Sequence, residues 1–434
     1  MTELKGVMTE ADIAALDAND PLAHCRARFQ LPPGKVYLNG NSLGPLPVDA
    51  VQRARDTVEQ QWGDDLVSSW NRHHWIDLPV SAGEKIAPLL GAAPGQVICC
   101  DSISVNLFKL LGQCLALRPG RRVVLSQQDN FPTDLYVAQG LSDLLENERC
   151  ELRTVAADSL LQALDNTVAV LMLTQVNFRD GSVHDIAALT RAAHDAGALV
   201  VWDLAHSAGV LPLTLDEWQV DFAVGCGYKY LNGGPGAPAF IYANRRYVDA
   251  IDNSTNNSPG TASSRLPGPF LQGWMGHQAP FDFNPDFVPA SGMASYLTGT
   301  PPILSLAVLD AALDQFADVE MTQLHSKSLA LSRLFMTLVD ARPVLSGLTL
   351  LTPDADTRRG GQLAYAHPHA YGVCQALAAK GVVADFRSPD VLRLGFSPLF
   401  LRFADIATAV KLLDDILADE TYLAPEFNRR NKVT

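Results

Sequence analysis

One lysine in this chain lies in a segment where a charged side chain indicates a chemical role. Lys229 follows an apolar run and stands inside the glycine-rich segment 225–236, directly after Tyr228. A lysine is usually a solvated surface charge, so a glycine-rich turn flanked by tyrosines is a poor place for an idle one. An aldehyde cofactor would give the amine a task, because amines and aldehydes form Schiff bases.

An acidic residue upstream supplies the second part of such a site. Residues 198–202 read as a buried parallel strand that ends in Asp203, and His206 follows after a short spacer. An acid at the carboxyl end of a strand points into the crevice where open α/β sheets bind ligands. Taken alone, Asp203 is more often a helix cap or a turn residue. Together with Lys229 it predicts pyridoxal phosphate, with the acid holding the ring nitrogen protonated and the amine forming the Schiff base.

Composition indicates a metabolic protein rather than a binder of nucleic acid or membranes. The chain has 434 residues, enough for a large core and two or three structural units. Its 33 basic and 47 acidic side chains give a formal net charge of −14, which disfavours nucleic acid and anionic membranes as partners. The N-terminus lacks a basic region followed by an apolar stretch, and no run is long enough to span a bilayer. We therefore expect a cytoplasmic protein.

The cysteines do not suggest a scaffold or a metal site. There are 7 of them, an odd number, and none stands in a Cys-x-x-Cys spacing. This pattern indicates neither a disulfide framework nor zinc, and we expect no metal. Most of the cysteines are expected to be small buried hydrophobes.

The order of the apolar runs predicts an α/β fold. Strand-like runs alternate with helical patterns between residues 48 and 245. The runs lie at 97–100, 123–125, 168–173, 199–202, 222–224 and 239–242. Residues 185–194 have helical periodicity with an acidic start, and Gly197 fits the end of that helix.

The rest of the chain divides into a long loop and a second domain. Residues 250–300 are rich in Asn, Ser, Gly and Pro and too long for an idle connection, so we interpret them as a functional loop. The later pattern predicts two longer helices, then strands at 348–351, 362–365 and 391–394 and a helix at 404–417. We expect an N-terminal segment (1–47) that contributes to the active site and the small domain, a large cofactor-binding domain (48–300) and a small α+β domain (301–434).

Seven segments, in chain order, resemble those of the kynureninase family. They are Tyr37–Pro45, Ser104–Lys109, Phe131–Asp134, Trp202–Gly209, Tyr228–Gly236, Gly273–His277 and Leu392–Leu394. The Asp-Leu-Ala-His sequence at 203–206 also occurs in related lyases and desulfurases, whereas Leu-Asn-Gly-Asn-Ser-Leu-Gly at 38–44 and Gly-Trp-Met-Gly-His at 273–277 are much more specific. The resemblance covers nearly the whole chain. It implies a pyridoxal phosphate hydrolase of aminotransferase fold type I, with a mostly parallel seven-stranded sheet in the large domain.

The resemblance also implies a reaction. This would be hydrolytic cleavage of the Cβ–Cγ bond of L-kynurenine, and of 3-hydroxy-L-kynurenine, to anthranilate or 3-hydroxyanthranilate and L-alanine, in tryptophan catabolism and NAD synthesis. Lys229 would remove the α-proton of the substrate and Asp203 would stabilise the positive ring nitrogen. Tyr228 would either move a proton to or from the tetrahedral adduct or only contact the phosphate. The preference between the two substrates depends on pocket contacts that the sequence leaves open.

The cofactor phosphate needs backbone N–H groups at a helix start together with hydroxyl groups. Residues 102–106, between an apolar strand and an apolar helix, offer that geometry, although an ordinary serine N-cap gives the same pattern. The resemblance assigns phosphate binding to Ile103, Ser104 and Tyr228. It adds Trp274 and Thr300 from the neighbouring subunit of a homodimer with shared active sites.

Four further residues could contact the cofactor ring. By resemblance, Phe131 stacks on the ring and His206 lies against it, although such residues are otherwise more often core or structural. Asp134 either caps the helix that follows it or lies near the cofactor. Thr174 ends an apolar run and is either a cofactor contact or a turn hydroxyl.

The substrates of this family carry an α-carboxylate and an aryl ketone. Arg393 could bind the carboxylate bidentately, since it lies in an otherwise apolar strand where an unpaired guanidinium would be costly. A buried ion pair with an aspartate is the alternative for Arg393, and Arg387 is its nearby competitor. By the same resemblance Ser42 and Trp70 line the aryl pocket, although a tryptophan more often serves packing.

Other protein classes share parts of this pattern. A cysteine desulfurase or selenocysteine lyase has the same fold and cofactor but needs a nucleophilic cysteine on a mobile loop, and Cys374 lies in a helical pattern instead. A non-catalytic binding module would not need Lys229, Asp203 and Arg393 together. An aminotransferase is less favoured, because nothing in the sequence indicates that two substrates are accommodated.

Overall fold

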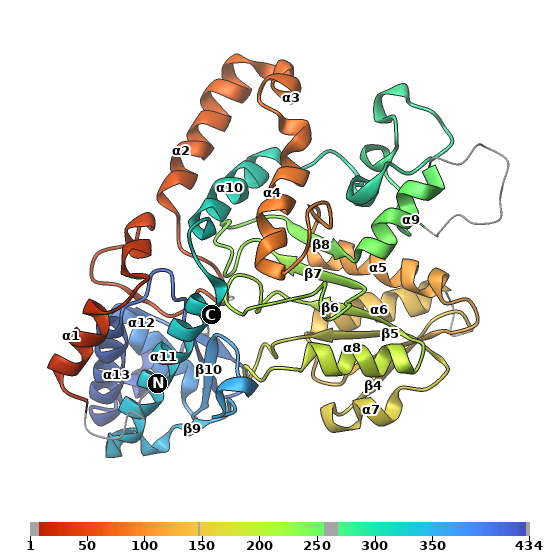
Figure 1. Ribbon diagram of the computed structural model, residues 1–434. Coiled ribbons are helices and arrows are strands. Elements are labelled where there is room, and N and C mark those ends of the chain that lie inside the picture. The colour runs from red at the N-terminus through yellow and green to blue at the C-terminus, as the bar shows by residue number, and fades with distance from the viewer. Residues whose placement is uncertain (1–7, 146–147, 256–267, 431–434) are drawn as a thin grey trace.

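The structure is a computed structural model that describes residues 8–145, 148–255 and 268–430 (Figure 1). Its largest element is a seven-stranded sheet of order β2-β8-β7-β6-β5-β3-β4. The strands are β2 (Val97–Cys99), β3 (Val123–Gln127), β4 (Glu151–Val155), β5 (Val168–Thr174), β6 (Leu199–Asp203), β7 (Phe222–Cys226) and β8 (Ala239–Ala243). β8 runs antiparallel to both of its neighbours, and the other neighbouring pairs are parallel. The expected α/β fold with a mostly parallel seven-stranded sheet is confirmed.

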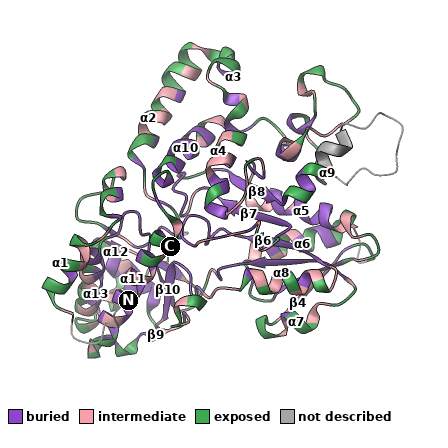
Figure 2. Ribbon diagram, in the orientation of Figure 1, coloured by how far each residue is buried: buried purple, intermediate pink, exposed green. Residues whose placement is uncertain are grey.

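Helices cover both faces of this sheet. They are α4 (Leu78–Ile86), α5 (Ile103–Leu117), α6 (Pro132–Leu145), α7 (Leu160–Ala163), α8 (Ile186–Asp195) and α10 (Ile303–Leu313). On β6, Val200 and Trp202 join a hydrophobic cluster with α4, α8 and α10, whereas Leu199 and Val201 join another with α5 and α6. The central strands are therefore buried on both sides, as Figure 2 shows, which explains why they read as continuous apolar runs.

The edge strand β4 is the one strand of this sheet that the apolar runs do not predict. Its sequence Glu-Leu-Arg-Thr-Val is half-buried throughout and pairs with β3 alone. An edge strand needs fewer apolar side chains because part of its surface faces water. The expected helix at 185–194 is present as α8, and its N-cap Asp185 accepts from the Ala188 N–H at 2.9 Å.

The C-terminal part forms a smaller α+β unit, seen at the lower left of Figure 1. Its sheet has the order β12-β13-β10-β9. Its elements are α11 (Met321–Asp340), β9 (Thr349–Leu350), β10 (Gln362–Ala366), α12 (Ala370–Ala379), β12 (Asp385–Arg387), β13 (Val391–Gly395) and α13 (Phe403–Ala418). Helix α10 packs instead on α4 and on α2 (Val48–Asp56), and the limits of the domains stay a prediction.

The N-terminal segment contacts both units. Helix α1 (Glu10–Ala18) lies beside α13, and the Asp17 carboxylate accepts from the first backbone N–H groups of α13 at 2.7 and 3.1 Å. Farther along, β1 (Val36–Tyr37) pairs in parallel with β11 (Val382–Val383). The chain then reaches the large sheet, where the Gly44 N–H donates to the Tyr228 carbonyl at 2.8 Å.

The segment expected to be a functional loop is only partly irregular. Helix α9 (Arg245–Thr255) extends into it, and short 3-10 turns occur at Trp274–Gly276, Pro280–Asp282 and Gly292–Tyr296. Residues 256–267 of this segment lie outside the described residues. Within the described ranges, no helix combines the length and the apolar character that crossing a membrane requires.

Candidate active site

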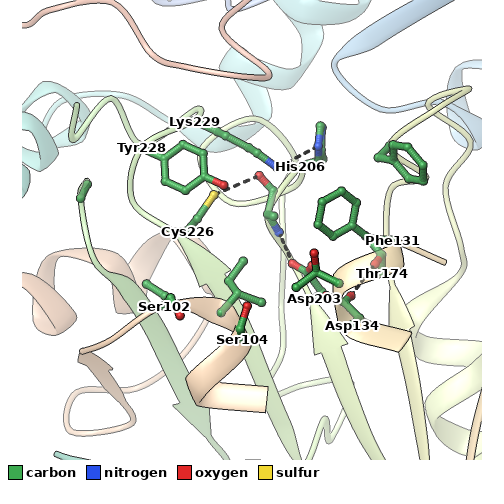
Figure 3. Close-up of a pocket in the computed structure, with 16 residues that line it drawn as sticks. Ser102, Ser104, Phe131, Asp134, Thr174, Asp203, His206, Cys226, Tyr228 and Lys229 are labelled. Carbon is green, nitrogen blue, oxygen red and sulfur yellow. Dashed lines mark hydrogen bonds between the residues drawn. The ribbon is translucent and has the colours of Figure 1, made fainter. Parts of the chain in front are cut away.

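The carboxyl ends of several parallel strands meet at one cavity of about 300 Å³. β2 leads through Ser102 into α5, β5 ends at Thr174, β6 ends at Asp203, and β7 leads into the turn that carries Lys229 (Figure 3). Open α/β sheets bind ligands at this edge, because the loops that leave the strands there can converge on one point.

Most residues expected to contact the cofactor line this cavity. They are Ile103, Ser104, Phe131, Asp134, Thr174, Asp203, His206, Tyr228 and Lys229. Trp274 and Thr300 do not line it. Trp274 is 41% exposed and stacks on Phe283 with ring centroids 6.4 Å apart, and Thr300 is exposed. Their role was expected across a subunit interface, so it stays a prediction.

Lys229 reaches the cavity from a turn that needs unusual backbone angles. Asn232 and Gly234 have φ values of 59° and 79°, in the left-handed region that glycine and asparagine tolerate best. The Lys229 Nζ lies 3.0 Å from His206 Nε2 and 5.9 Å from the centre of the Phe131 ring. The amine therefore points into the cavity, beside an imidazole and an aromatic ring.

Two buried carboxyl groups lie deeper in the same cavity. Asp203 accepts from the Ala205 N–H at 2.7 Å, and Asp134 accepts from the Thr174 hydroxyl at 3.2 Å. Burial raises the pKa of Asp203, while burial and the neighbouring Asp203 charge raise the pKa of Asp134 well above its usual range. Asp134 thus belongs to the cavity rather than serving only the helix start, and its neutral form is favoured.

This set of groups fits pyridoxal phosphate. Lys229 offers an amine, and Asp203 offers a buried carboxylate for a protonated ring nitrogen. Ile103 and Ser104 are the first two residues of α5, and a helix start favours an anion through its N–H groups and dipole. Asp134 and Asp203 are hydrogen-bonded to each other, so a protonated Asp134 donates to Asp203 and leaves Asp203 as the charged member of the pair, the form that a protonated ring nitrogen requires.

Arg393 lies outside the cavity lining, in a group that we call the arginine cluster. This cluster consists of Arg393, Arg387, Asp385 and Ser42. Arg393 is 1% exposed, and its Nη2 donates to the Asp385 carboxylate and, at 2.9 Å, to Ser42 Oγ. Its Nη1 donates to the Phe178 carbonyl. Arg387 Nη2 also contacts Asp385 Oδ2, at 2.9 Å. The structure therefore contains the ion pair considered as the alternative for Arg393, and substrate binding by Arg393 stays a prediction.

The two residues expected at the aryl pocket have different surroundings. Ser42 belongs to the arginine cluster, where its hydroxyl donates to Asp385 Oδ2 at 2.6 Å. Trp70, on α3 (Ser69–Arg72), packs edge-on against Trp75 with ring centroids 5.9 Å apart and does not line the cavity. A role of either residue in aryl recognition stays a prediction.

Several residues of the site escaped the sequence analysis. Phe178 and Cys226 line the cavity, Asp385 pairs with Arg393, and Gln362 bonds to His206 at 2.9 Å. Asp385 had a signal, since a buried arginine needs an anion and an acid stands just before Arg387. Gln362 had none, because a polar residue that begins an apolar strand is common.

Cys374 does not meet the needs of a desulfurase nucleophile. It lies in α12, is 3% exposed and does not line the cavity. Burial raises the pKa of its thiol to about 12, so the reactive thiolate is absent at neutral pH.

The fold and the cavity together define an enzyme of the pyridoxal phosphate-dependent fold type I. Residues 72–257 match the family model Aminotransferase class-V, and residues 324–413 match the Kynureninase C-terminal domain. The chain is 46% identical to the kynureninase of Burkholderia pseudomallei (strain 1106a) over 432 residues, 98% of this chain and 100% of that one. It is 44% identical to the kynureninase of Pseudomonas fluorescens over 431 residues, with the same coverage. The chain therefore belongs to the kynureninase family, which confirms the resemblance seen in its motifs and, with it, the expected cofactor.

Solved structures of other enzymes share the fold. A cysteine desulfurase from Thermococcus onnurineus NA1 superposes with a TM-score of 0.72 at 15% identity, covering 92% of this chain and 98% of that one. A C-DES variant with glycine covalently linked to its PLP cofactor superposes with a TM-score of 0.73 at 16% identity, covering 90% and 99%. At these identities the likeness shows the fold alone, so it does not favour desulfurase activity.

Proposed function

We propose that this chain hydrolyses the Cβ–Cγ bond of L-kynurenine to anthranilate and L-alanine, and that it also accepts 3-hydroxy-L-kynurenine. The observation that carries the proposal is the cavity that unites Lys229 and Asp203, in a chain that is similar to kynureninases over 98% of its length. Tryptophan catabolism and NAD synthesis are the pathways that this reaction would serve, in the cytoplasm.

The residues of the cavity divide the binding of pyridoxal phosphate among them. Lys229 would hold it covalently, Asp203 would bind the ring nitrogen, and the start of α5 at Ile103 and Ser104 would bind the phosphate. Phe131, which is 37% exposed, offers its ring for stacking. When bound, the cofactor supplies an electron sink for the carbon that carries the substrate amine.

Lys229 and its neighbours would carry out the proton transfers. The Lys229 amine would remove the proton from Cα of the substrate, with His206 Nε2 at 3.0 Å holding the amine in place. Burial raises the pKa of the Tyr228 phenol, so this group stays protonated at neutral pH. Tyr228 can then donate its proton to an oxygen that develops charge when water adds to the ketone.

The α-carboxylate of the substrate has one cationic partner in the expected place. Arg393 would bind it, but both terminal nitrogens of Arg393 already donate to internal acceptors, including the Asp385 carboxylate. Arg393 Nε is buried without a partner among the described residues, so a bidentate carboxylate would take Nε together with Nη2 and displace Asp385 from Nη2, while Asp385 keeps Arg387 as a second partner. Before the substrate binds, Asp385 compensates the buried charge of Arg393, so the fold does not bear the free-energy penalty of an unpaired buried cation.

We further propose a homodimer in which Trp274 and Thr300 of one subunit complete the site of the other. Exposed aromatic rings support this view, because Phe281 and Phe283 are 62% and 77% exposed and both pack on Trp274. Replacing Trp274 with alanine should then weaken cofactor retention in the dimer. Unchanged cofactor occupancy in that variant would count against the shared site.

The function is tested by the fluorescence of anthranilate. Purified protein, pyridoxal phosphate and L-kynurenine are incubated, with the variant Lys229→Ala as control and 3-hydroxy-L-kynurenine in a parallel reaction. Product from the wild type and none from the variant is the expected result. If cofactor binds but neither substrate yields product, the proposed reaction is wrong and assays for sulfur release from cysteine become the next step.

A further inference from the structure

Gln362 links the small domain to the amine of Lys229. It is the first residue of β10, is 1% exposed, and its amide lies between the large domain and the N-terminal segment. Its Nε2 donates to the carbonyl oxygens of Asn177 at 3.2 Å and Phe178 at 3.1 Å. Its Oε1 faces Asn41 Nδ2 at 3.2 Å and His206 Nδ1 at 2.9 Å.

The orientation of this amide follows from its partners. The carbonyl oxygens of Asn177 and Phe178 can only accept, so the NH₂ group of Gln362 must face them. The Oε1 atom is then the one that faces His206, and an amide oxygen can only accept. His206 Nδ1 must therefore carry a hydrogen.

The hydrogen on Nδ1 decides what the other ring nitrogen can do. His206 is 4% exposed, and burial together with the charges of Lys229 and Arg393 lowers its pKa well below the usual value. The ring is therefore neutral and has one hydrogen, which is already on Nδ1. Nε2 is left with a lone pair, and this lone pair faces Lys229 Nζ at 3.0 Å.

The opposite tautomer would obstruct the reaction. If Nε2 carried the hydrogen, it would repel a lysine ammonium. A neutral lysine amine would have to accept a hydrogen bond from Nε2–H, and its lone pair would then not be available for reaction. With the lone pair on Nε2, the Lys229 amine donates an N–H and keeps its own lone pair for bond formation and for removal of a proton.

We infer that Gln362 is a positioning residue that fixes the tautomer of His206 and thereby keeps the Lys229 amine free to react. This inference rests on the proposed function only for its effect on turnover, because the tautomer itself is a property of the protein. It also gives the small domain a direct influence on the reacting amine through one hydrogen-bonded amide.

The test is a ¹⁵N NMR measurement of the His206 tautomer in the full-length chain, before and after pyridoxal phosphate is added. The chain has 10 histidines, and the variant His206→Gln identifies the signals of His206. In the wild type we expect Nδ1 protonated and Nε2 unprotonated. In Gln362→Met, which keeps the length but removes the acceptor, we expect signals of the Nε2–H form.

Turnover should follow the tautomer. We expect kcat to fall about 10- to 100-fold in Gln362→Met with little change in KM, the size of effect seen when a partner that orients an imidazole is removed. Gln362→Glu restores an acceptor for Nδ1–H, and its protonated form keeps a donor toward the Asn177 and Phe178 carbonyls, so it should recover part of both the tautomer and kcat at a pH where this buried acid is neutral. Gln323→Met, on the exposed face of α11, is the matched control and should change neither.

Two results would overturn the inference. One is an Nε2–H tautomer in the wild type, and the other is an unchanged Nδ1–H tautomer in Gln362→Met. The wild-type measurement decides even if the variant does not fold. A chain with the expected tautomer but no activity towards kynurenine would refute the proposed function and leave the role of Gln362 in place.

Discussion

Buried carboxyl groups have pKa values shifted in opposite net directions in the two regions that we propose to bind cofactor and substrate. In the cofactor cavity, burial and the nearby Asp203 charge raise the pKa of Asp134. In the smaller α+β unit, burial also acts to raise the pKa of Asp385, but the charges of Arg393 and Arg387 lower it below its usual value. The cavity thus holds groups that a ligand can complete, whereas the arginine cluster is neutralised within the protein. Under the proposed roles of Asp203 and Arg393, a cofactor binds by addition, while a substrate carboxylate also displaces the Asp385 carboxylate from Arg393 Nη2.

The largest effect is expected from Lys229, which has no substitute in the cavity. Lys229→Ala should lower the rate of anthranilate formation by about 10⁴-fold or more, because both the covalent attachment and the proton acceptor are lost. Lys411→Ala, at an exposed position, is the control and should keep full activity. Substantial turnover by Lys229→Ala would mean that another group removes the α-proton.

The two carboxyl groups of the cavity should respond very differently to the same change. Asp203→Asn should lower kcat by about 10²- to 10³-fold, because a charge opposite the cofactor ring nitrogen is lost. Asp134→Asn should cost less than about 10-fold, because a raised pKa already favours the neutral acid there. Steady-state kinetics with L-kynurenine at saturating cofactor measure both. Equal losses would contradict the assignment of the charge to Asp203.

In the arginine cluster, a single substitution should lower the stability of the fold and raise the affinity for substrate. Arg393→Met should raise KM by about 30-fold or more, through loss of the charged partner of the substrate. Asp385→Asn should lower the free energy of unfolding by about 3 kcal/mol, because Arg393 loses its buried anion. It should also lower KM, since no internal carboxylate competes. Urea unfolding and kinetics give the two quantities, and a raised KM in Asp385→Asn would refute the exchange with substrate.

The smallest effect is expected in the pH dependence of stability, where the two regions should differ in sign. The stabilising contribution of Asp134 is present below its unfolded pKa of 3.8 and is lost as the pH rises through its raised folded pKa. The contribution of Asp385 is present above 3.8 and is lost as the pH falls through its lowered folded pKa.

Unfolding measured from acid to neutral pH should separate these two carboxyl groups. Relative to the wild type, Asp134→Asn gains stability as the pH rises, whereas the deficit of Asp385→Asn grows. For one group the slope stays below about 1.4 kcal/mol per pH unit. Slopes of the same sign for both variants would contradict the opposite shifts.

The sequence predicts the cavity better than it predicts the arginine cluster, for a physical reason. Thr174 and Asp203 end buried strands and Lys229 closely follows one, and parallel strands bring such positions to one edge of the sheet. Gln362 acts through contacts with residues far away in the chain, and nothing local distinguishes it from an ordinary polar residue. Asp385 pairs with the nearby Arg387 and Arg393, so its signal was local but was recognisable only once Arg393 was known to be buried. The edge strand β4 escaped prediction for a similar reason, since only its neighbour β3 makes it a strand.

The pairing of β1 with β11 also sets an order in time. Residues 36–37 leave the ribosome long before their partners at 382–383, because the whole large sheet lies between them in the chain. The Val36–Tyr37 strand therefore has to wait for its partner while the large sheet forms, although Gly44 of the same segment can already bond to the Tyr228 carbonyl. Nascent chains released before about residue 380 should hold a formed large sheet but an unpaired β1, so the synthesis of β11 is the step that fixes the N-terminal segment between the two units.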